Sequence, residues 1–357
     1  MPQLDAYLQK MLEMGGSDLH LQIGLQPRAR IHGRLTDLDP TALSKDRMDT
    51  LMREVCPNDR WEHFMDNRDL DFAYEIQGLA RFRCNYLDNH FGIGAVFRQI
   101  PSRIQTLDEL HLPEVLKKIC ALNRGLILVT GPTGSGKSTT MAAMIDYINT
   151  NWRKHIVTIE DPIEFVHKNK KSIIVHREVG EHSRSFAKAL RGAMRADPDI
   201  ILVGEMRELE TIKLALNCAA MGMLVFGTLH TNNAPKTIDR IIDVFPADQQ
   251  PQIRTMLAES LYGVVSQLLC RRIDGKGRLA VHEVLLRTES LPNVIREGQI
   301  STIRSLIQGS AGEGMMLMDA TLRKALDRGL ISPMEAYMKA SDKGEFQKLI
   351  TEDMVLD

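Results

Sequence analysis

The sequence contains no hydrophobic run long enough to cross a lipid bilayer. Its longest apolar stretches, such as MLVFGTL, are far shorter than the roughly 18 residues that a membrane-spanning helix needs. The amino terminus, MPQLDAYLQKMLEMGG, lacks the basic-then-apolar order of a signal peptide. It has instead the spacing of an amphipathic helix that ends at glycines. We therefore expect a cytoplasmic protein with no direct membrane insertion.

The chain is also nearly neutral overall and lacks cysteine-pair motifs. The 357 residues carry a formal net charge of −1, so bulk composition does not indicate a nucleic-acid partner. The five cysteines form no C-x-x-C pair, which argues against a disulfide framework and against a zinc site. We expect mostly buried thiols in a cytosolic chain that is long enough for about two domains.

One short stretch carries the strongest chemical signal. GPTGSGKST, from Gly131 to Thr139, fits the pattern G-x-x-x-x-G-K-[ST], with an apolar strand-length run before it and a helical pattern after it. In such a loop, backbone N–H groups surround phosphates, the lysine faces the β- and γ-phosphates, and the serine hydroxyl binds Mg²⁺. A glycine-rich turn that carries a lysine by chance is the alternative. The residues expected to bind ATP are Thr133, Gly134, Ser135, Gly136, Lys137, Ser138 and Thr139.

The strand and helix patterns divide the chain into two domains. Residues 17–98 have short alternating runs and a helical segment broken at Pro57, which is typical of a mostly antiparallel α+β unit. IPSRIQTLDELHLP follows as a linker. Apolar runs then alternate with helical stretches, which predicts an α/β fold with a parallel nucleotide-binding sheet. Beyond residue 250 the pattern predicts helices, one of them over PQIRTMLAESLYGVVSQLL.

Polar side chains follow three of the predicted strands. Glu160, Asp161 and Glu164 follow IVTI, Glu205 follows DIILVG, and His230 follows LVFGTL. Ligands of open α/β sheets bind at the carboxyl ends of the strands, so these groups suit Mg²⁺, an attacking water and a γ-phosphate. We expect the Glu205 strand to lie beside the P-loop strand, with Glu205 holding Mg²⁺ through water. Taken singly, such a carboxylate is often a helix N-cap and such a histidine a core residue.

Four motifs in this order resemble those of the secretion ATPase superfamily. GPTGSGKST, TIEDPIE, DPDIILVGEMRE and GTLHTNNA resemble its Walker A, Asp box, Walker B and His box. GGSDLHL, RFRCN, VFRQIP, IDRIIDVFP and IREG resemble the PilT/PilU group of type IV pilus retraction motors, from Gly15 to about Ile331. The resemblance implies a PAS-like amino-terminal domain at 1–100, a linker at 101–112 and a RecA-like ATPase domain with carboxyl-terminal helices at 113–357.

The resemblance also implies a role for the chain and its residues. It implies a homo-hexameric ring that uses ATP and Mg²⁺ to withdraw pilins at the cytoplasmic face of the inner membrane. The implied partners are an inner-membrane pilus platform protein and a paralogous retraction ATPase. Glu164 matches the catalytic carboxylate, Glu205 the Walker B carboxylate and His230 the γ-phosphate contact. The matching amino-terminal arginines are Arg81, Arg83 and Arg98, for which a solvated basic strand face is the alternative.

Two stretches differ from the retraction motors. LPNVIREG stands where the group usually has AIRNLIRE, and GMMLMDATLRKALDRGLISPMEAYMKASD resembles the accessory PilU type more than PilT. An accessory or paralogous motor is therefore one alternative. A pilus assembly or type II secretion ATPase is another, although such enzymes usually carry a four-cysteine zinc insertion. A nucleic-acid translocase is disfavoured by the near-neutral charge, and a nucleotide sensor by the complete set of carboxylates.

Overall fold

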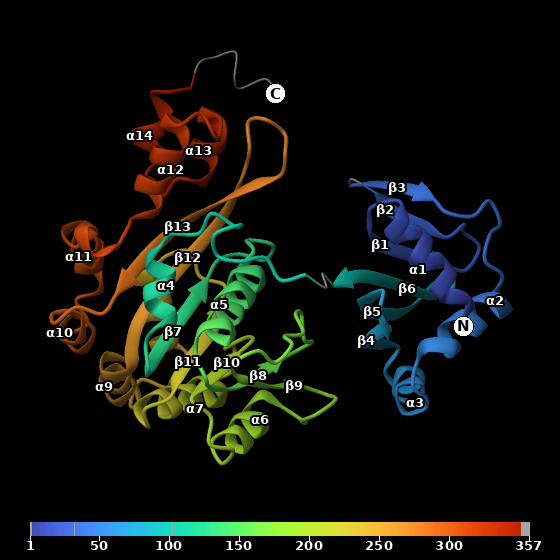
Figure 1. The fold of residues 1–357 in the computed structure, drawn as a ribbon, viewed down its shortest axis with the longest axis horizontal. Helices are drawn as coiled ribbons and strands as arrows, with labels where there is room; N and C mark the ends of the chain where they lie inside the picture. The colour runs from blue at the N-terminus through green and yellow to red at the C-terminus, as the bar shows by residue number, and fades with distance from the viewer. Residues whose placement is uncertain (1, 32, 101–102, 351–357) are drawn as a thin grey trace. The chain divides into compact units, whose positions relative to one another are not determined.

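The chain forms two compact units. The computed structural model describes residues 2–31, 33–100 and 103–350. One unit comprises Met1–Arg103 with Pro162–Val166, and the other comprises Ile104–Asp161 with His167–Asp357 (Figure 1). Among the residues so described, none of the helices combines the length and apolar character needed to cross a membrane.

The first unit is an antiparallel sheet with three helices. Its sheet has six strands in the order β3-β2-β1-β6-β5-β4, and neighbouring strands run antiparallel. The elements are α1 (Gln3–Glu13), β1 (Gly16–Gln22), β2 (Arg28–Ile31), β3 (Arg34–Asp37), α2 (Lys45–Val55), α3 (Asn58–Asn67), β4 (Asp69–Ile76), β5 (Ala80–Asn89) and β6 (Gly92–Ile100). The predicted helix break is confirmed, since Pro57 lies between α2 and α3 and caps the latter.

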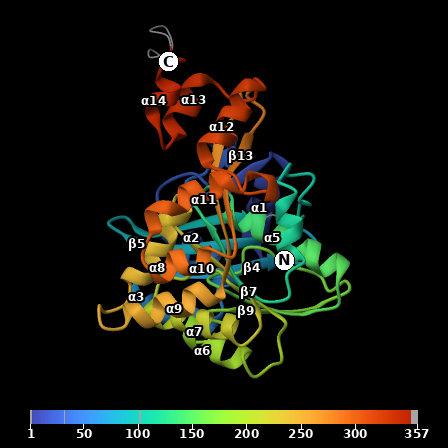
Figure 2. The same ribbon diagram turned by 90° about the vertical axis from the view of Figure 1, so that its left-hand side faces the viewer.

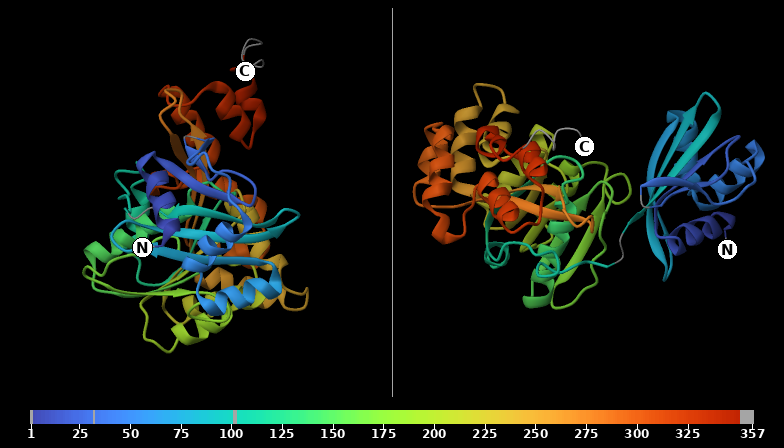
Figure 3. Two further views of the ribbon diagram at one scale, coloured as in Figure 1. Left: turned by 90° about the vertical axis from the view of Figure 1, so that its right-hand side faces the viewer. Right: turned by 90° about the horizontal axis from the view of Figure 1, so that it is seen from above.

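The three helices of this unit pack on one face of its sheet (Figure 3). Tyr86 is at the centre, with edge-to-face contacts to Phe64, Phe72 and Phe97 at ring separations of 5.0–5.9 Å. Its buried hydroxyl donates to Met52 O at 3.0 Å. Side chains alternate between the faces of a strand, so the residues between these core positions point to the opposite face.

The second unit contains a largely parallel sheet. Its seven strands lie in the order β13-β12-β7-β11-β10-β8-β9, and only the β12–β13 pair is antiparallel. The strands are β7 (Gly125–Thr130), β8 (His155–Glu160), β9 (Ile173–Glu178), β10 (Ile200–Val203), β11 (Leu224–Leu229), β12 (Leu261–Arg271) and β13 (Arg278–Leu286). The helices are α4 (Val115–Cys120), α5 (Lys137–Asn151), α6 (Phe186–Ala193), α7 (Leu209–Ala220), α8 (Ala234–Asp243), α9 (Gln250–Ser260), α10 (Leu291–Arg296), α11 (Ile303–Gly309), α12 (Met318–Asp327), α13 (Pro333–Lys339) and α14 (Lys343–Gln347).

Helices cover both faces of this sheet. In β7, Leu126 and Leu128 pack against the side covered by α6 to α11, part of which faces the viewer in Figure 2. Ile127 and Val129 point the other way, toward α4 and α5. Because both faces are covered, the central strands are apolar throughout, as parallel strands usually are. The helices α12 to α14 form a smaller core of their own, around Phe346.

The region after residue 250 corrects the sequence-based prediction. The segment PQIRTMLAESLYGVVSQLL is not one helix, because α9 ends at Ser260 and β12 begins at Leu261. Val264 and Val265 pack on opposite faces of the sheet, so this strand shows no alternation of apolar and polar residues. An apolar run without alternation fits a buried helix and a buried strand equally well. The segment from Leu261 forms a strand because it pairs with β7 and β13.

The cysteines are free thiols, as predicted. All five are buried, and none lies in a disulfide. Burial raises the pKa of the Cys56 and Cys218 thiols to about 11, so these side chains are neutral near physiological pH.

Candidate active site

The phosphate-binding loop joins β7 to α5. Gly131 and Gly136 have φ angles of 147° and 86°, which residues with a Cβ rarely adopt. A Cβ at Gly131 would also lie 2.3 Å from the carbonyl oxygen of Gln267. The loop leads into a helix of 15 residues, whose first N–H groups have no intrahelical partner and whose dipole favours an anion. This is the geometry of a phosphate site.

Lys137 lies at the start of α5 and bends back over the loop. Its Nζ donates to the carbonyl oxygens of Gly131 at 2.8 Å and Pro132 at 3.1 Å. The ammonium is therefore held at the loop, where phosphate oxygens can replace these carbonyls as acceptors. Ser138 and Thr139 follow on the first turn and are half-buried.

A buried polar chain supports the loop from the neighbouring strands. Gln267 of β12 donates from Nε2 to the carbonyl oxygen of Ser135 at 2.7 Å, and its Oε1 accepts from Thr140 Oγ1 at 2.7 Å. His282 of β13 lies with Nε2 3.0 Å from the same Oε1, so Nε2 must carry the proton. Burial lowers the pKa of His282 to about 4. The imidazole is therefore neutral near pH 7 and completes a support for the loop.

Sequence reasoning missed this support. Gln267 and His282 lie within the apolar runs VVSQLL and AVHEVLL, and both are buried. Polar residues inside a buried strand need hydrogen-bond partners, which is the signal that marks them. The P-loop partners of Gln267, Ser135 and Thr140, lie more than 100 residues away in sequence, so the sequence does not reveal what Gln267 and His282 support.

The order of the strands corrects a second prediction. β10, which leads to Glu205, does not lie beside β7, because β11 pairs with both strands and separates them. The apolar runs alone gave no signal that distinguished the two orders. As a result, the His box after β11 lies between the P-loop and Glu205 along the edge of the sheet. The structure brings His230 and Glu205 together, with Nε2 and Oε1 2.8 Å apart.

Glu205 has further neighbours at this edge. Its Oε1 also accepts a hydrogen bond from Nε of Arg207, and its side chain is 24% exposed. The preceding Gly204 allows close strand packing, since a Cβ there would lie 3.2 Å from the Cα of Glu160. The carboxylate is thus fixed by a histidine and an arginine but remains accessible to solvent.

The Asp box begins where β8 ends. Glu160 is the last residue of β8, with Oε1 4.0 Å from Nδ1 of His176 on β9. Nε2 of His176 accepts a hydrogen bond from the backbone N–H of His167 at 3.0 Å. Burial, together with the nearby His176, lowers the pKa of His167 to about 4. The chain that follows the Asp box is therefore anchored on β9.

Glu164 and the three arginines belong to the first unit. Glu164 falls in the segment Pro162–Val166. Arg81 and Arg83 lie on β5, and Arg98 is paired in register with Arg83 on β6. Because Phe82 and Phe97 fill the core, the three arginines share the opposite face of that sheet. The structure therefore groups the arginines with one another.

Arg98 and Arg83 lie beside acidic side chains. Arg98 Nε donates to Asp18 Oδ1 at 2.7 Å, and Arg83 Nε lies 3.6 Å from Asp71 Oδ1. Burial alone would raise the pKa of Asp18, but hydrogen bonds from Ser17 and Arg98 hold it below its usual value. Asp18 is therefore a charged, buried anchor for the exposed Arg98.

Comparison with known proteins places the chain in a family. A family model for type II/IV secretion system proteins matches residues 1–278. The chain is 48% identical over 328 residues to the type IV pilus retraction ATPase PilT of Pseudomonas aeruginosa, which covers 92% of this chain and 95% of that protein. It is 38% identical over 348 residues to the type IV pilus ATPase PilU of the same organism, and this match covers 98% of this chain and 91% of PilU.

A solved structure agrees with these relatives. A crystal structure of the pilus retraction motor PilT with bound ADP superposes with a TM-score of 0.90 at 43% identity, covering 98% of this chain and 99% of that one. The similarity thus extends over both units and includes a nucleotide-binding relative. The chain belongs to the type II/IV secretion system protein family and, within it, to the PilT/PilU group of type IV pilus ATPases, as its sequence motifs predicted.

Proposed function

We propose that this protein is an ATP-driven motor that retracts type IV pili. The observation that carries the proposal is the meeting of His230 and Glu205 at 2.8 Å on the sheet edge that also carries the P-loop, in a chain similar to PilT over almost its whole length. Carboxylate, imidazole and P-loop groups at one edge are the parts that hydrolysis of a γ-phosphate requires.

We further propose that the chain has the domains implied by its motifs. Residues 1–100 form a PAS-like domain, 101–112 a linker and 113–357 a RecA-like ATPase domain with carboxyl-terminal helices. The one-sided packing of helices on an antiparallel sheet supports the first, and the P-loop on a parallel sheet supports the third. Residues 1, 32, 101–102 and 351–357 of these ranges lie outside the described residues.

The phosphates bind the P-loop residues from Thr133 to Thr139. The Ser138 hydroxyl and the Glu205 carboxylate, the latter through water, suit Mg²⁺, since both present the hard oxygen ligands that this ion prefers. When bound, Mg²⁺ neutralises charge on the phosphate oxygens. Among the residues described, no three His, Cys, Asp or Glu side chains cluster as a metal site. His230 contacts the γ-phosphate in this scheme.

The Glu164 carboxylate accepts the proton of the attacking water. Arg81, Arg83 or Arg98 contributes positive charge to the transferred phosphate, as an arginine finger does. Both groups come from the unit that does not carry the P-loop. In this scheme, hydrolysis removes the γ-phosphate that these groups bind. A ligand shifts a protein between two domain arrangements when it binds one of them more tightly than the other, so loss of the γ-phosphate can drive the domain movement.

The motor acts as a homo-hexameric ring. A closed ring uses a heterologous interface, through which each subunit passes its domain movement to the next. We place the ring at the cytoplasmic face of the inner membrane, where it acts on a pilus platform protein and cooperates with a paralogous ATPase. A PilU-like accessory motor is the second candidate, and the carboxyl-terminal sequence from Gly314 to Asp342 favours it.

An ATPase assay tests the catalytic part of this proposal. Purified protein should hydrolyse ATP in the presence of Mg²⁺, with no stimulation by DNA. Lys137→Ala is the matched control and should abolish the activity. Absence of hydrolysis in the native protein would refute the motor, and stimulation by DNA would indicate a nucleic-acid translocase.

A further inference from the structure

A buried carboxylate on β13 contacts the start of the helix that follows the His box. Glu283 is 6% exposed, and its Oε1 accepts a hydrogen bond from the backbone N–H of Ala234 at 2.8 Å. Ala234 is the first residue of α8. This N–H has no partner within the helix, so Glu283 supplies the acceptor that a side-chain cap would otherwise provide.

The start of α8 fixes the His box. His230 precedes Ala234 by four residues, and Leu229 before it belongs to β11. Asn233 caps the helix by accepting from the N–H of Lys236 at 2.9 Å. The segment from His230 to Asn233 is therefore a short bridge between a central strand and α8. A shift of the first turn of α8 must move this bridge, and with it the imidazole that contacts Glu205.

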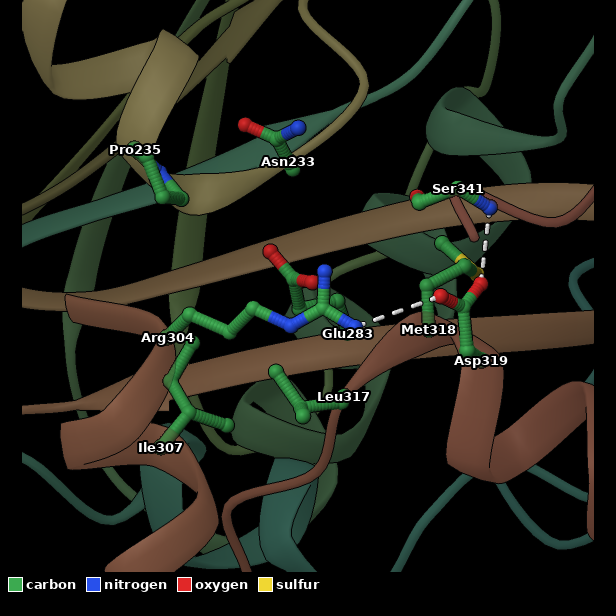
Figure 4. A pocket seen from close by; sticks show the side chains of 9 residues that line it. All are labelled: Asn233, Pro235, Glu283, Arg304, Ile307, Leu317, Met318, Asp319 and Ser341. Carbon is green, nitrogen blue, oxygen red and sulfur yellow. Dashed lines mark hydrogen bonds and ion pairs between the residues drawn. The ribbon is translucent and has the colours of Figure 1, made fainter. Parts of the chain in front are cut away.

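An arginine beside Glu283 pairs with a carboxyl-terminal helix. Arg304 of α11 lies beside Glu283 and directs its guanidinium at Asp319 of α12, with Nη2 and Oδ2 3.6 Å apart (Figure 4). The carboxylate of Asp319 accepts from the N–H groups of Ser341 at 2.8 Å and Asp342 at 3.0 Å. Glu283, Arg304, Asp319 and Ser341 line a small pocket of about 60 Å³.

The charges in this cluster depend on one another. Burial raises the pKa of Glu283, whereas the N–H groups of Ala234 and Met318 and the charge of Arg304 act in the opposite direction. Two buried carboxylates close together need a cation between them. The charge of Arg304 acts on Glu283, and its guanidinium pairs with Asp319, which also holds the segment before α14.

We propose that Glu283 is a positioning residue for His230, and that Arg304 ties it through Asp319 to the carboxyl-terminal helices. This inference rests on the proposed role of His230 at the γ-phosphate. The P-loop has its own support in Gln267 and His282. Loss of Glu283 should therefore disturb the His box without disturbing phosphate binding.

The test measures kcat and nucleotide affinity in two backgrounds. Glu283→Met removes the acceptor at similar side-chain length. It should lower kcat about tenfold, because a displaced catalytic group costs far more in rate than in binding. The Kd for ADP should change less than about threefold. In the His230→Ala background, the same substitution should lower kcat less than about twofold, since residues that act as one unit are not additive.

Two further variants keep the test independent of folding. Glu283→Gln retains an acceptor for Ala234 and should recover part of the lost rate. Arg304→Met alters a side chain that is 55% exposed. It should lower kcat less than Glu283→Met does, and in the His230→Ala background it should have no effect on kcat. Arg323→Met is the matched control, because Arg323 on α12 pairs only with Asp327 among the ion pairs of the described residues. It should leave kcat unchanged.

The outcomes separate this inference from the proposed function. An equal loss of kcat from Glu283→Met with and without His230 would overturn the positioning role, as would a loss of ADP affinity that parallels the loss of rate. A His230→Ala variant with the native kcat would instead show that His230 has no part in hydrolysis. The inference about Glu283 would then fall with that assignment, while the ATPase itself would stand.

Discussion

The buried His282 should make the stability of the protein depend on pH. Its imidazole is 2% exposed, and burial lowers its pKa to about 4, against about 6.5 in an unfolded chain. Below pH 6.5 the unfolded state binds a proton that the folded state does not. The stability that neutral His282 provides is therefore complete above pH 6.5 and is lost progressively as the pH falls to 4.

The size of the effect follows from the two pKa values. One pH unit below the unfolded pKa, at pH 5.5, the free energy of unfolding should fall by about 1.4 kcal/mol because of this group alone. At pH 4 and below the loss should approach about 3.4 kcal/mol. His167, whose pKa burial also lowers to about 4, should add a similar dependence of its own.

A substitution isolates the contribution of His282 to the pH dependence of the free energy of unfolding. His282→Gln keeps a donor for Gln267 Oε1 but has no titratable group. Urea unfolding at pH 7.5 and 5.5, at fixed protein concentration, should show a pH-dependent loss that is smaller in the variant by about 1.4 kcal/mol. His90→Gln, at an exposed position, is the matched control and should behave like the native chain. An identical pH dependence for native protein and His282→Gln would refute the reasoning.

Three further predictions concern the proposed mechanism. Replacing Arg81, Arg83 or Arg98 by Ala should leave ATP binding within roughly tenfold, while turnover falls roughly 10³-fold for at least one; normal turnover in all three would contradict the arginine finger. Glu164→Gln should retain Mg·ATP affinity but lose roughly 10²-fold in kcat, whereas high magnesium should partly restore Glu205→Gln; the reverse pattern would exchange their roles. Light scattering with Mg·ATP should show a ring, and monomers alone would contradict it.

Local patterns were sufficient to predict most elements of both units. The alternating runs within residues 17–98 and the apolar runs of β7 to β11 each follow from a few consecutive residues, and strands form at all of them. The run RARIHGRLTDL indicates one strand, but it contains two, β2 and β3. The P-loop was predictable for the same reason, since its glycines, Lys137 and Ser138 lie within nine residues. Such signals require no knowledge of distant parts of the chain.

Features that depend on distant pairing were not predictable. β12 was mistaken for a helix because neither of its faces is polar, and β10 was placed beside β7 because nothing local shows that β11 separates them. Gln267, His282 and Glu283 were missed for a related reason. Each lies in a mostly apolar stretch of a strand, and its role follows only from partners that folding brings to it.

The most direct test of retraction is to delete the gene and measure surface pili and twitching. A retraction motor removes pilins from the fibre, so the deletion strain should carry excess pili and fail to move. Complementation with the native gene should restore movement, and complementation with Lys137→Ala should not, because the P-loop lysine is needed for ATP hydrolysis. A deletion strain that lacks surface pili would contradict the account and indicate an assembly ATPase.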